Sequence, residues 1–121
     1  NKLITFDMGG TSTDVSLFNQ RYDYRYESKV GNLKILSPSL AIETIAAGGG
    51  SVCSFDGYRF TVGPESAGAQ PGPACYGAGG PLTITDVNLL AGRIDPSHFA
   101  MPLSVEKAEE ALHNLISHVQ K

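Results

Sequence analysis

The stretch from Gly63 to Pro81 sets the firmest limit on the architecture, because it is dense in glycine, proline and alanine. Proline cannot donate a backbone hydrogen bond, and glycine loses the most conformational freedom on folding, so we predict no regular structure there. A loop of this length in a compact domain is either functional or pinned to a neighbouring element. Helices and strands are therefore expected on either side of it.

The residues before this loop show the pattern of β-strands. Leu3 to Asp7 and Asp14 to Phe18 are separated by Gly9-Gly10, and we predict that they form a hairpin. Tyr22 to Tyr26 alternates aromatic with charged residues, which is the period of a strand. The short turn before it predicts a three-stranded antiparallel meander that ends at about Val30.

Further elements are predicted farther along the chain. Leu33 to Leu36 is expected to be a strand, and Val52 to Val62 a hairpin in which Asp56-Gly57 forms a type I′ turn. Thr85-Asp86 is expected to cap a short helix through Leu90. A last helix is predicted from Ser104 to about His118, with one apolar stripe formed by Val105, Ala108, Leu112, Leu115, Ile116 and Val119.

The composition is that of a soluble globular protein. The 121 residues are 41% hydrophobic and 17% charged, which excludes a disordered, collagen-like or coiled-coil chain. A formal net charge of -3 offers no positive field to nucleic acid. No apolar run approaches the ~20 residues of a membrane-spanning helix. We expect a single domain over residues 1–121, with no nucleic-acid or membrane partner.

The cysteines and the first residue bear on the origin of the chain. Cys53 and Cys75 are too few for a secreted disulfide framework, which favours free thiols and a cytoplasmic location. The chain begins with Asn1 rather than Met, and a strand pattern starts at Leu3. We therefore expect this chain to be a piece of a longer polypeptide.

The segment from Asp7 to Asp14 combines two glycines, three hydroxyl residues and a carboxylate at each end. Glycines let backbone N–H groups approach phosphate oxygens, hydroxyls add donors, and Asp7 can hold Mg²⁺ directly or through water. The alternative is a hairpin turn whose polar side chains satisfy their own backbone. The residue types alone favour this alternative.

Five strings of this sequence resemble the hydantoinase A and 5-oxoprolinase family, a branch of the actin-like, sugar-kinase-like ATPases. Phe6 to Val15 is similar to the family's second phosphate-binding hairpin. The other four follow in the family's order: Ala46 to Ser51, Val62 to Ala69, Pro71 to Gly77 and Thr85 to Asn88. The resemblance spans most of residues 6–94, and the last helix carries no motif.

The resemblance implies a mixed α/β (α+β) fold, namely a ribonuclease-H-like, actin-like ATPase lobe with an antiparallel β-meander and flanking helices. In such proteins two similar lobes close on ATP, and the first lobe carries its own phosphate turn. No second copy of that turn occurs in this sequence. The chain is thus expected to be the second lobe, with the first lobe of the same polypeptide missing.

Members of the family use ATP to phosphorylate the oxygen of a cyclic amide, such as 5-oxoproline or a hydantoin, so that water can open the ring. The resemblance therefore implies an ATP-dependent cyclic-amide hydrolase, with ATP and Mg²⁺ as cofactors. It also implies a companion subunit or domain similar to hydantoinase B. The isolated chain is expected to bind nucleotide weakly and to be inactive.

Carried onto this sequence, the resemblance implies catalytic carboxylates and a set of nucleotide-binding residues. Asp7 would orient Mg²⁺ or the attacking group, and Asp14 is either catalytic or a strand-start residue that ties down the turn. The string from Gly48 to Ser51 either lies against the ligand or is a plain tight bend. The implied nucleotide-binding residues are Gly9, Gly10, Thr11, Ser12, Thr13, Gly48, Gly49, Gly50 and Ser51.

Other polar residues carry further expectations. Glu65 and Ser66 either face substrate or belong to a packed loop, and Asp86 is read first as a helix cap and second as a substrate residue. Cys75 has no positive neighbour in the sequence and is interpreted as a core cysteine rather than a nucleophile. His113 and His118 lie about 140° apart around the last helix, so no protein-only metal site is predicted.

The sequence departs from the family pattern at two positions. Glu43 stands where members often carry His, and Ala78 stands where many carry Arg, so the roles of those side chains are not inherited. The strings lean toward the oxoprolinase-like branch and leave the identity of the cyclic amide open. Two alternatives remain: a lobe of a sugar or acetate kinase of the same superfamily, and an interaction module without catalysis.

Overall fold

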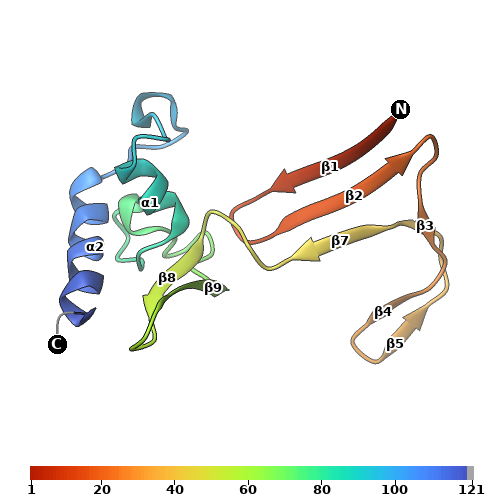
Figure 1. Cartoon of the computed structure of the whole chain (residues 1–121), viewed down its shortest axis with the longest axis horizontal. Coiled ribbons are helices and arrows are strands. Elements are labelled where there is room, and N and C mark those ends of the chain that lie inside the picture. Colours follow the sequence, from red (N-terminus) through yellow and green to blue (C-terminus); the bar gives the residue numbers. More distant parts are fainter. Residues whose placement is uncertain (120–121) are drawn as a thin grey trace. The chain divides into compact units, whose positions relative to one another are not determined.

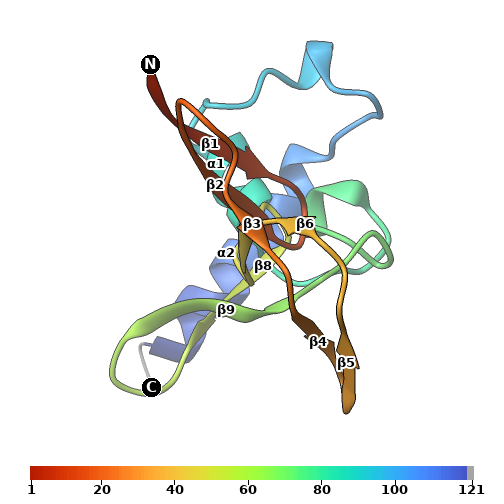
Figure 2. The same ribbon diagram turned by 90° about the vertical axis from the view of Figure 1, so that its right-hand side faces the viewer.

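The computed structural model describes residues 1–119, which fold as two compact units (Figures 1 and 2). Unit 1 contains Asn1–Asp7 and Thr13–Ile45. Unit 2 contains Met8–Ser12 and the chain from Ala46 onward. The turn Met8–Ser12 is therefore grouped with unit 2.

The main sheet of unit 1 confirms the first predicted hairpin. Strands β1 (Lys2–Met8) and β2 (Thr13–Asn19) are neighbours in a three-stranded sheet of order β1-β2-β7 (Figure 1). The side chains of Thr5 and Ser16 join the two strands by a 2.6 Å hydrogen bond. Strand β7 (Ile42–Ile45) pairs antiparallel with β2, in a register that sets Thr13 opposite Ile45.

The predicted three-stranded meander is wrong, because Tyr22 to Tyr26 does not form the third strand. Only β3 (Tyr24–Arg25) is a strand there, and it pairs with β6 (Ser39–Leu40) rather than with β2. Alternating side chains indicate a strand but do not identify the strand with which it pairs. The third strand of the sheet is β7, which the sequence did not predict. The predicted strand from Leu33 is confirmed as β5 (Leu33–Ile35), paired with β4 (Ser28–Val30).

Apolar side chains on both faces of the unit 1 sheet are exposed in the described part of the chain. On β1, Leu3 is 57%, Ile4 72% and Phe6 68% exposed. Successive residues of a strand point to opposite faces, so Ile4 and Phe6 lie on one face of the sheet and Leu3 lies on the other. Neither face of this sheet is covered by another layer formed from residues 1–119.

The second predicted hairpin is confirmed by β8 (Ser51–Phe55) and β9 (Phe60–Ser66) of unit 2. Its predicted type I′ turn is wrong, because Phe55 pairs with Phe60 and the loop is longer than two residues. Of the loop residues only Gly57 has a positive φ, of 96°, whereas a type I′ turn needs two. Asp56 Oδ1 instead accepts the N–H groups of Tyr58 and Arg59, each at 3.0 Å.

The stretch from Gly63 to Pro81 contains more regular structure than predicted. Strand β9 continues through Pro64 to Ser66, which is allowed because a proline is tolerated in a two-stranded sheet on the side that needs no donor. A short 3₁₀ helix, η1 (Ala74–Tyr76), interrupts the remaining loop. Gly80 closes this loop so tightly that a Cβ there would collide with the carbonyl oxygen of Gly72.

Among the described residues, unit 2 contains three further helices after η1. They are α1 (Ile84–Leu90), the 3₁₀ helix η2 (Pro96–His98) and α2 (Val105–Val119). The Ser104 hydroxyl accepts the N–H of Lys107 at 3.2 Å, so the predicted start of the last helix is confirmed. The buried residues Cys75, Leu89 and Ala108 form the core, with Tyr76, Leu90, Ile94 and Leu103 packed against them. None of the helices described is long and apolar enough to cross a membrane.

Candidate functional site

The turn between β1 and β2 presents three backbone donors in a row. Gly9 donates its N–H to the carbonyl oxygen of Ser12 at 2.8 Å, which closes the turn. The next three N–H groups, those of Gly10, Thr11 and Ser12, donate to no other group among residues 1–119. Thr11 is exposed and Ser12 is half-buried. Consecutive N–H groups without protein acceptors are candidate donors to an anion.

The glycine string that follows β7 lies directly against this turn. Gly49 donates its N–H to the Gly9 carbonyl oxygen at 3.1 Å, and Gly50 donates to the Gly10 carbonyl oxygen at 2.6 Å. A Cβ on Gly48 would lie 2.6 Å from the carbonyl carbon of Gly10, so only glycine allows this approach. We call Gly48–Ser51 the glycine platform, because it packs against the turn and hydrogen-bonds to its carbonyl groups.

The platform uses its own backbone donors within the protein. Besides the two donations to the turn, Gly48 N–H donates to Ser51 Oγ at 3.0 Å, and Ser51 N–H donates to the Gly48 carbonyl oxygen at 3.1 Å. All four N–H groups of the platform are therefore used inside the protein. Gly49 and Gly50 hold the turn, whereas Gly48 and Ser51 bond to each other, and the N–H groups of all four are occupied.

The predicted pair Glu65 and Ser66 is divided by the structure. Ser66 lies beside the turn, where its hydroxyl donates to Thr11 Oγ1 in a long 3.5 Å hydrogen bond and accepts Gly68 N–H at 3.1 Å. Glu65 lines a separate hollow of about 220 Å³, with Val52, Ser54, Gly63 and Pro64. Consecutive strand residues point to opposite sides, so the two side chains do not share a site.

Asp86 is fully buried and hydrogen-bonded within the protein. Its side chain is 0% exposed, and Oδ2 accepts the N–H and the hydroxyl of Thr83 at 2.7 and 2.9 Å. Oδ2 also accepts Ala74 N–H at 3.1 Å, and Oδ1 accepts Cys75 N–H at 2.8 Å. The N-cap of α1 is Thr83, with Asp86 in the first turn, rather than the predicted Thr85-Asp86.

The two cysteines are free thiols, as predicted. Cys75 is 0% exposed, and its burial, followed by its hydrogen bond to Asp86 and that residue's charge, raises the pKa of the thiol to about 12. Burial, and then the charge of Asp86, also raises the pKa of Cys53. A thiol that stays protonated is a poor nucleophile, so Cys75 is a core cysteine, as the sequence indicated.

The two predicted catalytic carboxylates and Thr13 have different surroundings. Asp7 is exposed near the end of β1. Asp14 Oδ1 accepts the hydroxyl of Thr44 on β7 at 2.7 Å, so it ties neighbouring strands together. Thr13 is only 4% exposed, so its side chain faces protein rather than ligand. Nowhere in the described chain do three His, Cys, Asp or Glu side chains gather as metal ligands.

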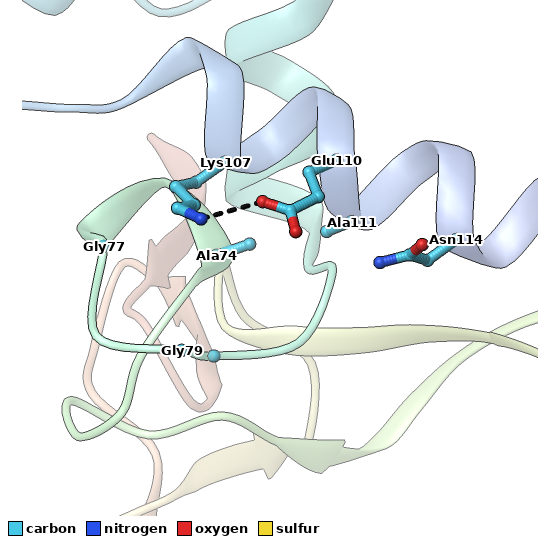
Figure 3. A pocket seen from close by; sticks show the side chains of 8 residues that line it. Ala74, Gly77, Gly79, Lys107, Glu110, Ala111 and Asn114 are labelled. Carbon is cyan, nitrogen blue, oxygen red and sulfur yellow. Dashed lines mark hydrogen bonds and ion pairs between the residues drawn. The ribbon is translucent and has the colours of Figure 1, made fainter.

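A hollow of about 240 Å³ lies between the loop around η1 and helix α2 (Figure 3). Its polar side chains are Asn114 and the ion pair between Lys107 Nζ and Glu110 Oε2, at 2.8 Å. The remaining lining residues are small: Ala74, Gly77, Gly79, Gly80 and Ala111. None of the predicted site residues lines this hollow, so it is not part of the turn site.

Sequence reasoning missed the part played by Thr85. Its N–H and its hydroxyl both donate to the Gly49 carbonyl oxygen, at 2.8 and 2.9 Å. The sequence indicates Thr85 only as a helix cap, because no local pattern links it to a glycine 36 residues earlier.

Comparison with known proteins decides the family. A family model described as Hydantoinase/oxoprolinase matches residues 1–121. The chain belongs to the hydantoinase/oxoprolinase family. The resemblance carried by the sequence strings is thereby confirmed.

Two relatives and one solved structure illustrate the likeness. A 5-oxoprolinase of Dictyostelium discoideum is 46% identical, over 98% of this chain and 10% of its own length. The caprolactamase subunit alpha of Pseudomonas jessenii is 45% identical, over 76% of this chain and 14% of its own length. A nucleotide-free structure of acetone carboxylase, from work on ATP-dependent acetone carboxylation, superposes with a TM-score of 0.79 at 28% identity, over 97% of this chain and 18% of its own.

This chain corresponds to only a small part of each of these proteins. The chain spans less than a fifth of the length of each of these three proteins. Its mixed α/β structure with antiparallel strands is the fold that it shares with acetone carboxylase.

Proposed function

We propose that this chain supplies the phosphate-binding turn of an ATP-dependent enzyme that opens a cyclic amide. The observation that carries the proposal is the row of three N–H groups on Gly10, Thr11 and Ser12, whose backbone is held from behind by Gly49 and Gly50. A terminal phosphate presents several charged oxygens to such a row of donors. The hydroxyls of Thr11 and Ser12 add donors at the same turn.

The substrate class is supported by the family and by the relatives. The names 5-oxoprolinase and caprolactamase both denote enzymes that act on cyclic amides. Acetone carboxylase supports the use of ATP, because its reaction is described as ATP-dependent. We propose that the longer protein phosphorylates an amide oxygen. Phosphorylation makes the attached carbon more electrophilic, so that water can add to it.

The proposed reaction has three steps. The amide oxygen attacks the γ-phosphorus of ATP, and ADP leaves. Water adds to the activated carbon, the ring C–N bond breaks with a proton passing to nitrogen, and a second water releases phosphate. The turn holds the transferring phosphoryl group throughout, and its N–H groups stabilise the charge on the phosphoryl oxygens.

Magnesium fits the residues present, with Asp7 as the protein ligand. Mg²⁺ in such enzymes keeps several waters and binds through one or two carboxylates together with substrate phosphates, so a cluster of protein ligands is not required. Asp7 is exposed and comes just before the turn along the chain. The ion would offset the phosphate charge, while Asp7 holds it directly or through water.

The wider architecture is part of the same proposal. We place the chain in the second lobe of a ribonuclease-H-like, actin-like ATPase, closed on ATP by a first lobe of the same polypeptide. A companion hydantoinase B-like subunit or domain would complete the hydrolysis. The designation of the caprolactamase relative as a subunit alpha supports a partner of this kind.

The experiment that tests the function uses Gly10→Ala in the full-length protein. A Cβ on Gly10 would meet nothing within 4 Å, so the variant keeps its fold, while the new methyl group obstructs an anion at the turn. We expect ATP-dependent ring opening to fall by at least about tenfold, which corresponds to about 1.4 kcal/mol. Asp7→Asn is expected to lower kcat.

The outcomes distinguish the alternatives. An opened ring together with ADP and phosphate supports the hydrolase, whereas a released phosphorylated product supports a sugar or acetate kinase. Normal assembly without any ATP dependence, unchanged in Gly10→Ala, supports an interaction module. Ring opening by Gly10→Ala at the wild-type rate and KM for ATP would remove the turn from the mechanism.

A further inference from the structure

The carbonyl oxygen of Gly49 joins helix α1 to the phosphate turn. It accepts two hydrogen bonds from Thr85, one from the N–H at 2.8 Å and one from the hydroxyl at 2.9 Å. The N–H of the same glycine donates to the Gly9 carbonyl oxygen at 3.1 Å. Hydrogen bonds at the C=O and at the N–H of Gly49 therefore connect Thr85 and the turn to the same glycine, entirely within unit 2.

The same groups are in close van der Waals contact. A Cβ on Gly49 would lie 2.8 Å from Thr85 Oγ1, and a Cβ on Gly50 would lie 2.9 Å from the Gly10 carbonyl oxygen. The platform therefore fits between the Thr85 side chain and the turn without room for a methyl group. Closely packed groups transmit a displacement rather than absorb it, so a shift at Thr85 moves the turn.

Thr85 is itself held by a rigid support. It lies in the first turn of α1, between the N-cap Thr83 and the buried Asp86. Asp86 binds the N–H groups of Ala74 and Cys75, which fixes the start of α1 to η1 and to the core of unit 2. The hydroxyl of Thr85 is thus a fixed donor rather than a mobile surface group.

We propose that Thr85 is a positioning residue for phosphate binding, acting through Gly49. By fixing the platform, it lets Gly49 and Gly50 hold the carbonyl groups of the turn, so that the N–H groups of Gly10, Thr11 and Ser12 are presented together. Thr85 itself contacts no phosphate. The inference rests on the proposed function for its catalytic readout, but the mechanical link can be measured without nucleotide.

The test compares Thr85→Val with Thr85→Ser in the full-length protein. Valine keeps the shape and the backbone N–H and removes only the hydroxyl donor, whereas serine restores the donor. Thr61→Val is the matched control, because Thr61 also makes a hydroxyl hydrogen bond in unit 2, at 2.7 Å to Ser54, but on the β8–β9 hairpin. Two quantities are measured: amide hydrogen exchange of peptides covering residues 8–12 and 48–51, and the KM values for ATP and for the cyclic amide.

We expect Thr85→Val to raise exchange in both peptides and to raise the KM for ATP by about fivefold, the effect of losing one hydrogen bond. The KM for the cyclic amide should stay unchanged. Thr85→Ser should restore both quantities to within about twofold of wild type, and Thr61→Val should match wild type.

Each other outcome has a definite meaning. Unchanged exchange over residues 8–12 in Thr85→Val overturns the inference, whatever the nucleotide data show. Faster exchange throughout unit 2, including α2, would mean general loosening and would also overturn it. If exchange rises only in the two peptides while wild-type protein uses no ATP, the positioning role stands and the proposed function fails. Should Thr85→Val not fold, Thr85→Ala is measured against Thr85→Ser in the same way.

Discussion

The carboxylate of Asp86 accepts the backbone N–H of Cys75 at 2.8 Å, across 11 residues of sequence. The buried carboxylate accepts three further hydrogen bonds, from the N–H of Ala74 and from the N–H and hydroxyl of Thr83. The loop around η1 is therefore fixed to α1 by a single side chain. A buried charge is tolerated only when it is fully hydrogen-bonded, so this side chain is sensitive to any change of its oxygens.

Replacing Asp86 by asparagine should open the loop around Cys75. The amide has one acceptor oxygen, and its NH₂ group would face an N–H donor, so at least one buried donor loses its partner at a cost of about 1–3 kcal/mol. We expect thiol labelling of Cys75, followed by peptide mass spectrometry on the full-length protein, to become about tenfold faster or more. Asp95→Asn is the control, because exposed Asp95 caps η2 by accepting Ser97 N–H at 2.9 Å and does not touch Cys75. Equal labelling in Asp86→Asn and wild type would contradict this assignment.

Alkaline pH should weaken unit 2 through Cys75. The folded thiol has a pKa of about 12, above its ordinary value of 9.0, so between these pH values the unfolded state has lost a proton that the folded state keeps. Stability from this group is complete below pH 9.0 and is lost as the pH rises toward 12. We expect proteolysis within residues 63–81 to accelerate with pH more steeply in wild type than in Cys75→Ala. Parallel pH profiles for the two proteins would show that Cys75 does not titrate as proposed.

Gly80→Ala should destabilise the same loop by steric collision. The new methyl group would overlap the carbonyl of Gly72 and approach the carbonyl carbon of Pro73 at 3.2 Å, and backbone cannot move aside as a side chain can. We expect a cost of about 2 kcal/mol or more, read as faster labelling of Cys75. Gly79→Ala is the comparison: its φ of 80° costs about 1 kcal/mol, and its Cβ meets nothing within 4 Å. A larger effect at Gly79 than at Gly80 would argue against this packing.

The isolated chain of residues 1–121 should bind ATP only weakly and turn over no substrate. The turn supplies donors to the phosphates, whereas the proposed first lobe would supply the other side of the nucleotide site. We expect a Kd of about 1 mM or weaker by calorimetry, with circular dichroism confirming that unit 2 is folded. Micromolar binding by this chain alone would mean that the proposed first lobe is not needed.

Much of the local structure was predictable because short-range rules govern it. Alternation and turn residues located β1, β2, β8 and β9, and a serine before an apolar stripe located the start of α2. The pairing of β7 with β2 was not predictable, because the intervening residues 20–41 form two small two-stranded sheets before the chain returns. Long-range pairing leaves no local mark on the sequence.

The sequence predicted which residues form the candidate site, but it did not predict the hydrogen bonds among them. The strings identified Gly9–Ser12 and Gly48–Ser51, but whether the second string touches ligand or turn depends on which carbonyl oxygens its N–H groups reach. The same holds for Asp86, whose four donors come from two separate segments. Glu43, which departs from the family pattern, forms an exposed ion pair with Arg25.

The exposed apolar side chains of the unit 1 sheet have a consequence for folding during synthesis. Leu3, Ile4 and Phe6 leave the ribosome long before Cys75, Leu89 and Ala108 are synthesised, and β1 has a free edge in the described sheet. An unpaired sheet edge with apolar side chains is a template for pairing with another chain, so this sheet is an aggregation hazard until it is covered. Unit 2, by contrast, buries Cys75, Leu89 and Ala108 in a core of its own.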